Sequence, residues 1–188
     1  TAVPWTHPRA SPGVCRCVEG KAHSSEGVEA SYPGLSYGEA ITSRIAFRER
    51  TMTVMTAAAI EDFLDDVFPQ RMGTIEAVSE MRATMSLAIE DEHLRPGASV
   101  SGPTMMGLAD VCLYVAILAQ IGPEPMAVTS NLNCHFLRRA RGDRDLIANA
   151  RLIKLGRRLA VGEVELFSDG DEAPVAHVTA TYVLPDND

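Results

Sequence analysis

The residue best placed to do chemistry is Asp110, the only charged side chain in the eighteen-residue run TMMGLADVCLYVAILAQI from Thr104 to Ile121. A helix that is apolar on every side is normally a buried helix. An ionised carboxylate is costly in such a setting unless it is paired, hydrogen-bonded or part of a site. Pro103 suits the first position of this helix, where its missing N–H is not needed. Asp110, about two turns further on, is therefore expected to be paired, hydrogen-bonded or part of a functional site.

A structural role for the same carboxylate is the alternative. Asp110 can pair with Arg95, or it can accept backbone hydrogen bonds at a helix junction. Metal binding is not indicated elsewhere in the chain, because Cys15 and Cys17 have no second pair of ligands and His93 and His135 have no converging partners. The sequence therefore predicts no metal site.

Charge is unevenly distributed along the chain. The net charge is −8, yet eight of the eleven Lys and Arg residues beyond residue 50 fall between Arg138 and Arg158. One basic segment on an acidic body favours an anionic ligand held locally, and it does not suggest a nucleic-acid coat. The apolar run approaches the length of a membrane span, but it holds Asp110 near its middle. Residues 1–10 contain no apolar signal segment. We expect a cytoplasmic protein without a membrane or nucleic-acid partner.

The elements that position these residues are predicted from composition and periodicity. Residues 1–51 are rich in Gly, Pro and Ser and are expected to form a low-complexity, disordered or loosely packed extension. Residues 52–188 form the folded domain. A helix capped by Thr56 and ended by Pro69 comes first, followed by a strand in which Met81 to Ile89 alternate with polar residues.

A run of strands follows the central helix. Four segments are predicted at 127–137, 146–155, 159–168 and 175–184, and their short connections favour an antiparallel meander. A sheet that wraps one buried helix satisfies this order, which is an α+β architecture.

Several segments together resemble the PaaI-type hotdog acyl-CoA thioesterases. They are RPGASVSGP at 95–103, LAD at 108–110, AVTSNLNCHFLRRA at 127–140 and ARLIKLGRRLAVGEVELFS at 150–168. The resemblance covers about residues 56–184. It implies a hotdog fold, in which an antiparallel sheet wraps a long central helix, and a homodimer or dimer of dimers with shared active sites.

The resemblance also implies roles for individual residues. Asp110 falls on the acidic position of the family, where it would act as a general base toward water or as a nucleophile. Gly102 falls on the glycine whose backbone N–H polarises the thioester carbonyl. Such an N–H at a helix N-terminus can stabilise the oxyanion of the reaction. Thr129 matches a residue that relatives supply from the partner subunit to hold the attacking water. Asn131 and Asn133 are expected on the same strand face as Thr129.

Other positions depart from the family pattern or extend it. Ser101 replaces a His, Pro103 replaces a second Gly, and Arg95 stands in place of an Asn, where it can still offer hydrogen bonds to the carbonyl. These three residues and Asn131 are expected to bind the substrate. The resemblance and the suitability of arginine for phosphates together predict contacts to the nucleotide of coenzyme A. The residues expected to make them are drawn from Arg138, Arg139, Arg141, Arg157 and Arg158.

The implied function is hydrolysis of an acyl-CoA thioester to the free acid and CoA, with no cofactor other than the CoA of the substrate. A non-catalytic acyl-CoA-binding or sensing protein on the same fold is the main alternative. A hotdog enoyl-CoA hydratase is the other, but that chemistry usually calls for a His beside the acid, and none lies between Arg95 and Ile121.

Overall fold

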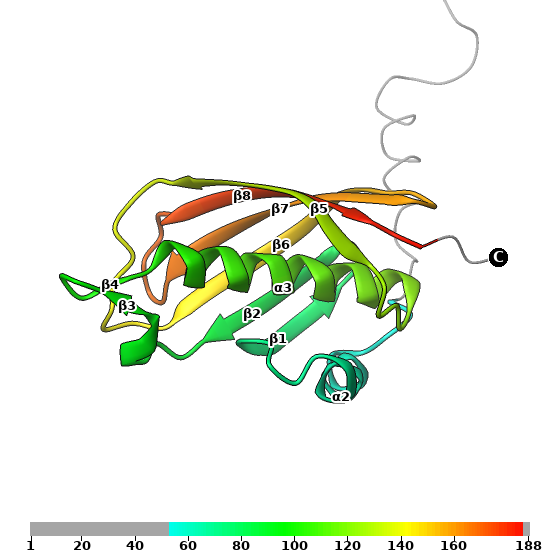
Figure 1. The fold of residues 1–188 in the computed structure, drawn as a ribbon, viewed down its shortest axis with the longest axis horizontal. Helices are drawn as coiled ribbons and strands as arrows, with labels where there is room; N and C mark the ends of the chain where they lie inside the picture. Colours follow the sequence, from blue (N-terminus) through cyan, green and yellow to red (C-terminus); the bar gives the residue numbers. More distant parts are fainter. Residues whose placement is uncertain (1–52, 186–188) are drawn as a thin grey trace, which may run out of the picture. The chain divides into compact units, whose positions relative to one another are not determined.

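A computed structural model describes residues 53–185, so the expected extension at 1–51 lies outside the described residues. One long helix lies against the concave face of a six-stranded antiparallel sheet with strand order β1-β2-β6-β7-β8-β5 (Figure 1). In chain order the elements are α2 (Ala57–Val67), β1 (Thr74–Ser79), β2 (Arg82–Leu87), the 3₁₀ turn η1 (Asp91–His93), β3 (Leu94–Arg95), β4 (Ser99–Val100), α3 (Gly102–Ile121), β5 (Val128–Phe136), β6 (Leu146–Leu155), β7 (Leu159–Ser168) and β8 (Ala176–Val183).

Helix α2 forms as predicted. The hydroxyl of Thr56 accepts a hydrogen bond from the N–H of Ala59 at 3.3 Å, which caps the first turn. Ile60 and Leu64, one turn apart, are fully buried. The helix ends at Val67, before Pro69.

Helix α3 is the core of the domain. Thirteen of its twenty residues are buried, which agrees with its apolar sequence on every side. By length and composition it could cross a membrane, but here it is the central helix of a folded domain. Ser101 caps it and Gly102 is its first residue, so the prediction that Pro103 occupies the first position is off by one residue.

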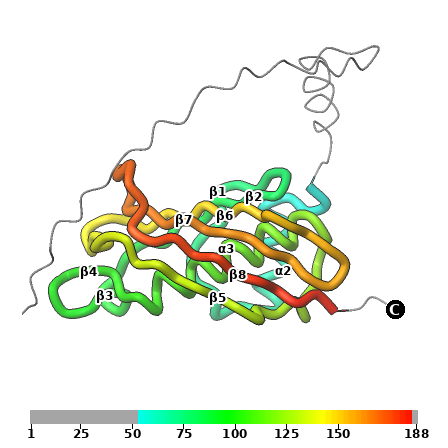
Figure 2. The backbone as a smooth tube through the Cα atoms, turned by 90° about the horizontal axis from the view of Figure 1, so that it is seen from above, coloured from blue at the N-terminus to red at the C-terminus, as the bar shows by residue number. Residues whose placement is uncertain are grey.

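The sheet confirms part of the predicted meander. β6, β7 and β8 are consecutive antiparallel neighbours. β5 does not join β6, however, because it pairs with β8 at the far edge of the sheet, as Figures 1 and 2 show. The place beside β6 is taken by β2. β5 therefore leaves one side without a strand partner within the described chain.

Two hairpins were not expected from the sequence. β1 and β2 are joined through a tight turn in which Met81 adopts a positive φ of 58°. The segment predicted as a loop before α3 contains the short β3–β4 hairpin, with Gly97 and Ala98 in its turn. This hairpin leads the chain directly into the start of α3.

Candidate functional site

Asp110 is held by two hydroxyl groups on the inner face of the sheet. Thr129 Oγ1 on β5 donates to Asp110 Oδ1 at 2.6 Å, and the Tyr182 hydroxyl on β8 approaches the same oxygen at 2.7 Å. Tyr182 also lies 2.8 Å from the main-chain carbonyl oxygen of Asp110. Within residues 53–185 no hydrogen bond reaches Oδ2, and no ion pair joins Asp110 to Arg95. One carboxylate oxygen is thus fixed and the other is open.

Thr129 makes this contact within one chain. This geometry differs from the expected supply of the threonine by a partner subunit, because Thr129 reaches Asp110 without one. The residues are adjacent because β5, running back beside β8, passes along α3 at the level of Asp110.

Asn131 and Asn133 do not share the face of Thr129. Thr129 pairs with the buried Tyr182, whereas Asn131 pairs with Thr181, and the register shifts between the two positions of β5 as at a β-bulge. Directly opposed residues of a sheet share a face, and an extra residue in one strand reverses the alternation. Asn131 and Asn133 consequently lie on the outer face, away from Asp110 of the same chain, which corrects the expected face.

Tyr182 was missed by the sequence reasoning. Its ring is 3% exposed and stacks in parallel on Tyr114, with ring centroids 6.1 Å apart. Burial raises the pKa of Tyr182, and the negative charge of Asp110 raises that pKa further, so the hydroxyl keeps its proton and remains a donor. The Tyr114 hydroxyl donates instead to the carbonyl of Glu124 at 2.8 Å.

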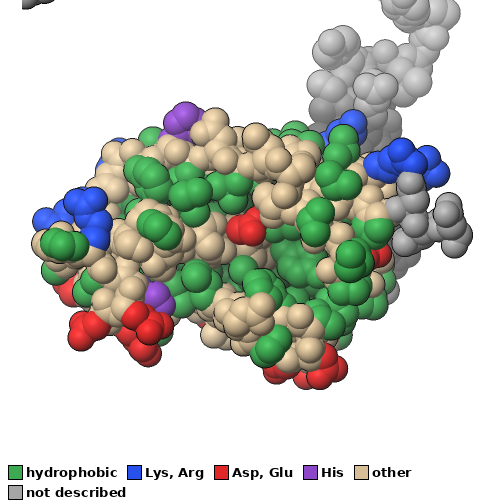
Figure 3. Space-filling view, viewed as in Figure 1, with side chains coloured by type: hydrophobic (Ala, Val, Ile, Leu, Met, Phe, Trp, Pro, Cys, Tyr) green, Lys and Arg blue, Asp and Glu red, His purple; other side chains and the backbone are tan. Residues whose placement is uncertain are grey.

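A pocket of about 310 Å³ opens beside Asp110, and we call it the aspartate pocket. On the face of the molecule that Figure 3 shows, hydrophobic side chains surround a hollow with a small acidic group beside it. Apart from Asp110 and the hydroxyls of Thr129 and the two tyrosines, its lining side chains are apolar. They come from the end of α2, from the α3–β5 connection and from β5: Val67, Phe68, Pro125, Ala127 and Val128.

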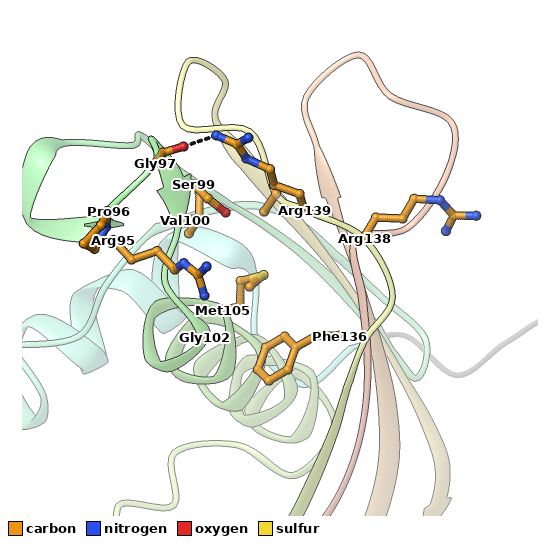
Figure 4. Close-up of a pocket in the computed structure, with 11 residues that line it drawn as sticks. Arg95, Pro96, Gly97, Ser99, Val100, Gly102, Met105, Phe136, Arg138 and Arg139 are labelled. Carbon is orange, nitrogen blue, oxygen red and sulfur yellow. Dashed lines mark hydrogen bonds between the residues drawn. The ribbon is translucent and has the colours of Figure 1, made fainter. Parts of the chain in front are cut away.

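A second pocket, of about 490 Å³, lies at the start of α3, and we call it the helix-start pocket. Gly102 and Met105 line it from the helix, and the Phe136 ring faces the helix start, as Figure 4 shows. A Cβ on Gly102 would lie 3.1 Å from Phe136 Cζ. The Arg95 side chain extends toward Met105, and its guanidinium makes no hydrogen bond or ion pair within residues 53–185.

Ser101 and Pro103 do not line the helix-start pocket. The Ser101 hydroxyl accepts from the N–H of Thr104 at 3.3 Å and lies 2.8 Å from the Thr104 hydroxyl, so it is occupied as the helix cap. Pro103 borders a different hollow, shared with His93 and Thr104. The expectation that Ser101 and Pro103 bind the substrate therefore finds no support in their placement in this chain.

The arginines fall into two separated groups. Arg139 donates to the carbonyls of Gly97 and Ala98 and so holds the β3–β4 turn, while Arg138 donates to the carbonyl of Pro174 at 2.9 Å and points away from the pocket (Figure 4). Arg157 and Arg158 lie in the β6–β7 turn, at the opposite end of the sheet from Arg138 and Arg139. Within one chain, therefore, the arginines from which the nucleotide contacts are expected lie at two ends of the sheet.

The other candidate groups do not form a site. Burial raises the pKa of the Cys112 thiol to about 12, and its sulfur is directed at the carbonyls of Ala83 and Ala148, so it is no nucleophile at neutral pH. Among the described residues there is no group of three or more His, Cys, Asp or Glu side chains that could hold a metal ion.

Gly102 and Asp110 lie on one helix but face different pockets. They are eight positions apart, which corresponds to about 12 Å along the axis of an α-helix. A single thioester carbonyl is too small to contact both the N–H of Gly102 and the carboxylate of Asp110 in the same copy of the chain.

Comparisons with known proteins agree with this architecture. The model of the thioesterase superfamily matches residues 97–175. A candidate esterase of Pseudomonas aeruginosa is 32% identical over 108 residues, 57% of this chain and 78% of that protein. The crystal structure of a candidate thioesterase from Silicibacter sp. TM1040 is 46% identical, covers 71% of this chain and 94% of its own, and superposes with a TM-score of 0.66.

A more distant structure shows the same fold. A variant of the phenylacetic acid degradation protein PaaI from Thermus thermophilus is 22% identical, with a TM-score of 0.54 over 66% of this chain and 99% of that one. The chain belongs to the thioesterase superfamily. The predicted family resemblance and the hotdog fold are confirmed, and membership supports thioester hydrolysis as the class of activity.

Proposed function

We propose that the protein hydrolyses acyl-CoA thioesters as a homodimer, with each active site built from two copies. Asp110 and Thr129 of one copy would face the start of α3 of the other. The observation that carries the proposal is the state of Asp110, whose Oδ1 is fixed by two hydroxyls and whose Oδ2 is free beside an apolar pocket. No cofactor is needed beyond the CoA of the substrate.

The edge strand β5 supports a dimer of this kind. Its outer side has no strand partner in the described chain, and Val128, Phe136 and the adjacent Leu137 are 54%, 52% and 48% exposed. An unpaired strand edge is a ready surface for another strand. A two-fold axis through the middle of β5 would pair it antiparallel with its own copy.

Such a pairing would bring the two kinds of pocket together. The Val128 end of one β5, with the aspartate pocket, would lie beside the Phe136 end of the other, with the helix-start pocket. The same axis would move the Arg157–Arg158 turn of one copy toward the end of the sheet where Arg138 and Arg139 of its partner lie. A dimer would thus bring Gly102 close to Asp110 of the partner, and it would bring the two arginine groups to the same end of the assembly.

The chemistry follows from these placements. Asp110 Oδ2 takes a proton from a water held near Thr129, and the water oxygen bonds to the thioester carbon. The negative charge on the carbonyl oxygen is met by the Gly102 N–H of the partner and by its unpaired Arg95. The intermediate then expels the CoA thiolate by breaking the C–S bond, and the proton on Asp110 passes to the sulfur. Attack by Asp110 itself, followed by hydrolysis of the anhydride, needs the same groups.

The two pockets suit different parts of the substrate. The aspartate pocket, lined by Phe68, Tyr114 and Val128, would take the acyl group. The helix-start pocket carries Arg95 and would lie toward the CoA moiety. Met105 lines the helix-start pocket and not the aspartate pocket.

Thiol release across a panel of acyl-CoAs tests the proposal. The wild-type protein should release CoA from at least one of them, and Asp110→Asn should lose about 10²–10⁴-fold in kcat. Asp62→Asn, which removes an exposed carboxylate on α2, is the matched control and should retain wild-type turnover. Saturable binding of acyl-CoA without thiol release would overturn hydrolysis and favour the binding function.

A further inference from the structure

We infer that Tyr182 is a positioning residue that orients the carboxylate of Asp110 for reaction, an inference that rests on the proposed function. Tyr182 does not approach the open Oδ2 or the reacting carbon. Its role would be exerted through Asp110, by fixing Oδ1 so that Oδ2 presents its lone pairs to water in the aspartate pocket.

The contacts of Tyr182 fix more than one torsion of Asp110. The hydroxyl lies 2.7 Å from Oδ1 and 2.8 Å from the main-chain oxygen of the same residue. A group that contacts both ends of an aspartate restrains the side chain relative to its own backbone. Thr129 is exposed on an edge strand and, of the Asp110 atoms, contacts Oδ1 alone, so it cannot supply this restraint by itself.

The ring of Tyr182 is itself held in place. It occupies an inward position of β8, between Thr129 on β5 and Ala160 on β7, and it is 3% exposed. The parallel stack with Tyr114 fixes its plane, with 5° between the rings. Tyr114 is in turn anchored through its hydroxyl to the carbonyl of Glu124. The hydroxyl is thus aimed at Asp110 by core packing, as preorganised sites require.

A simple core role does not account for this arrangement. Buried tyrosine hydroxyls usually find one partner, and the main-chain oxygen of Asp110 alone would satisfy this one. The approach to Oδ1 as well places a neutral donor beside a carboxylate at the wall of a pocket. The hydroxyl remains protonated because burial and the Asp110 charge both raise its pKa.

Tyr182→Phe is the direct test, since it removes the hydroxyl and keeps the stacked ring. We expect kcat to fall about 10- to 100-fold, because small misplacements of a reacting group carry losses of that order. KM should stay within about twofold, and thermal unfolding should occur within a few degrees of wild type. Thr179→Val is the control, because it removes a hydroxyl from the outer face of the same strand, opposite Glu163, and should change neither constant.

Crystal structures of the wild type and of Tyr182→Phe give a readout that does not depend on activity. We expect the Asp110 carboxylate to rotate or to occupy two conformers in the variant. An unchanged carboxylate together with unchanged kcat would overturn the inference, as would a fall in kcat that only follows loss of folded protein. If the wild type releases no CoA from any acyl-CoA, the proposed function fails, whereas the Asp110 conformation still decides the role of Tyr182.

Discussion

The ring of Phe136 lies over Gly102, so that a Cβ on the glycine would come within 3.1 Å of Phe136 Cζ. β5 thereby covers the start of α3 just where the proposed oxyanion donor emerges. Gly102→Ala keeps the N–H but pushes the ring aside, and we expect kcat/KM to fall about tenfold.

A compensating substitution sharpens this prediction. Phe136→Leu in the Gly102→Ala background should restore part of the lost kcat/KM, because the smaller side chain relieves the contact. Steady-state kinetics of the two single variants and the double variant measure this. A double variant worse than both singles would contradict steric crowding as the cause.

Thr129 and Tyr182 share one acceptor, and their effects should be coupled. Either hydroxyl alone can partly hold Asp110 Oδ1, so Thr129→Val and Tyr182→Phe combined should lower kcat by more than the product of the two single effects. A double-mutant cycle in kcat measures the coupling. Effects that simply multiply would show that the two hydroxyls act independently.

Close packing between α3 and β7 predicts a stability effect. A Cβ on Gly162 would overlap Leu113 and lie 2.9 Å from the carbonyl oxygen of Arg151. Gly162→Ala should therefore lower the free energy of unfolding by about 1–3 kcal/mol, the usual cost of overpacking. Gly156→Ala, in the β6–β7 turn with a milder 3.3 Å contact to the Leu159 oxygen, should cost less. Urea denaturation compares them, and equal losses would contradict this packing.

The buried thiol of Cys112 predicts a loss of stability at alkaline pH. Burial raises its pKa from 9.0 to about 12 in the folded protein. Above about pH 9 the unfolded thiol ionises while the folded one stays neutral. The contribution of the buried thiol to the free energy of unfolding is therefore complete below pH 9, and it declines by up to about 1.4 kcal/mol per pH unit above it. The stability deficit of Cys112→Ala relative to wild type should shrink between about pH 8 and pH 9.5. Cys134→Ala, at a half-buried site, should show a smaller change, and a constant deficit for Cys112→Ala would contradict the assignment.

Much of the fold could be predicted because its signals are local. The apolar run indicated α3, the alternating residues indicated β2, and the bounds predicted for β6 and β7 match those observed. The tight β1–β2 turn is made by Glu80 and Met81, neither of which is a typical turn residue such as Gly or Asn. The sequence therefore did not indicate this turn. The place of β5 beside β8 depends on pairing between distant segments, which periodicity does not specify.

The candidate site was predictable only where one residue stood out from its surroundings. Asp110 did, because a lone acid in an apolar helix is conspicuous. Tyr182 did not stand out, because a tyrosine at an inward strand position is typical of the hydrophobic core. Its contact with Asp110 depends on the packing of β8 on α3. The bulge after Thr129, which reverses the expected faces of Asn131 and Asn133, likewise depends on strand pairing that the sequence pattern does not specify.

The central claim is that each active site combines Asp110 of one copy with Gly102 of another, and subunit complementation tests it most directly. Asp110→Asn and Gly102→Pro, which removes the donor N–H at a helix position that tolerates proline, should each be nearly inactive alone while still folded. Co-expressed with different tags and purified as a mixture, they should regain about a quarter of wild-type turnover, because half of the dimers are mixed and each has one intact site. Activity no higher than that of the two inactive parents would contradict a shared site.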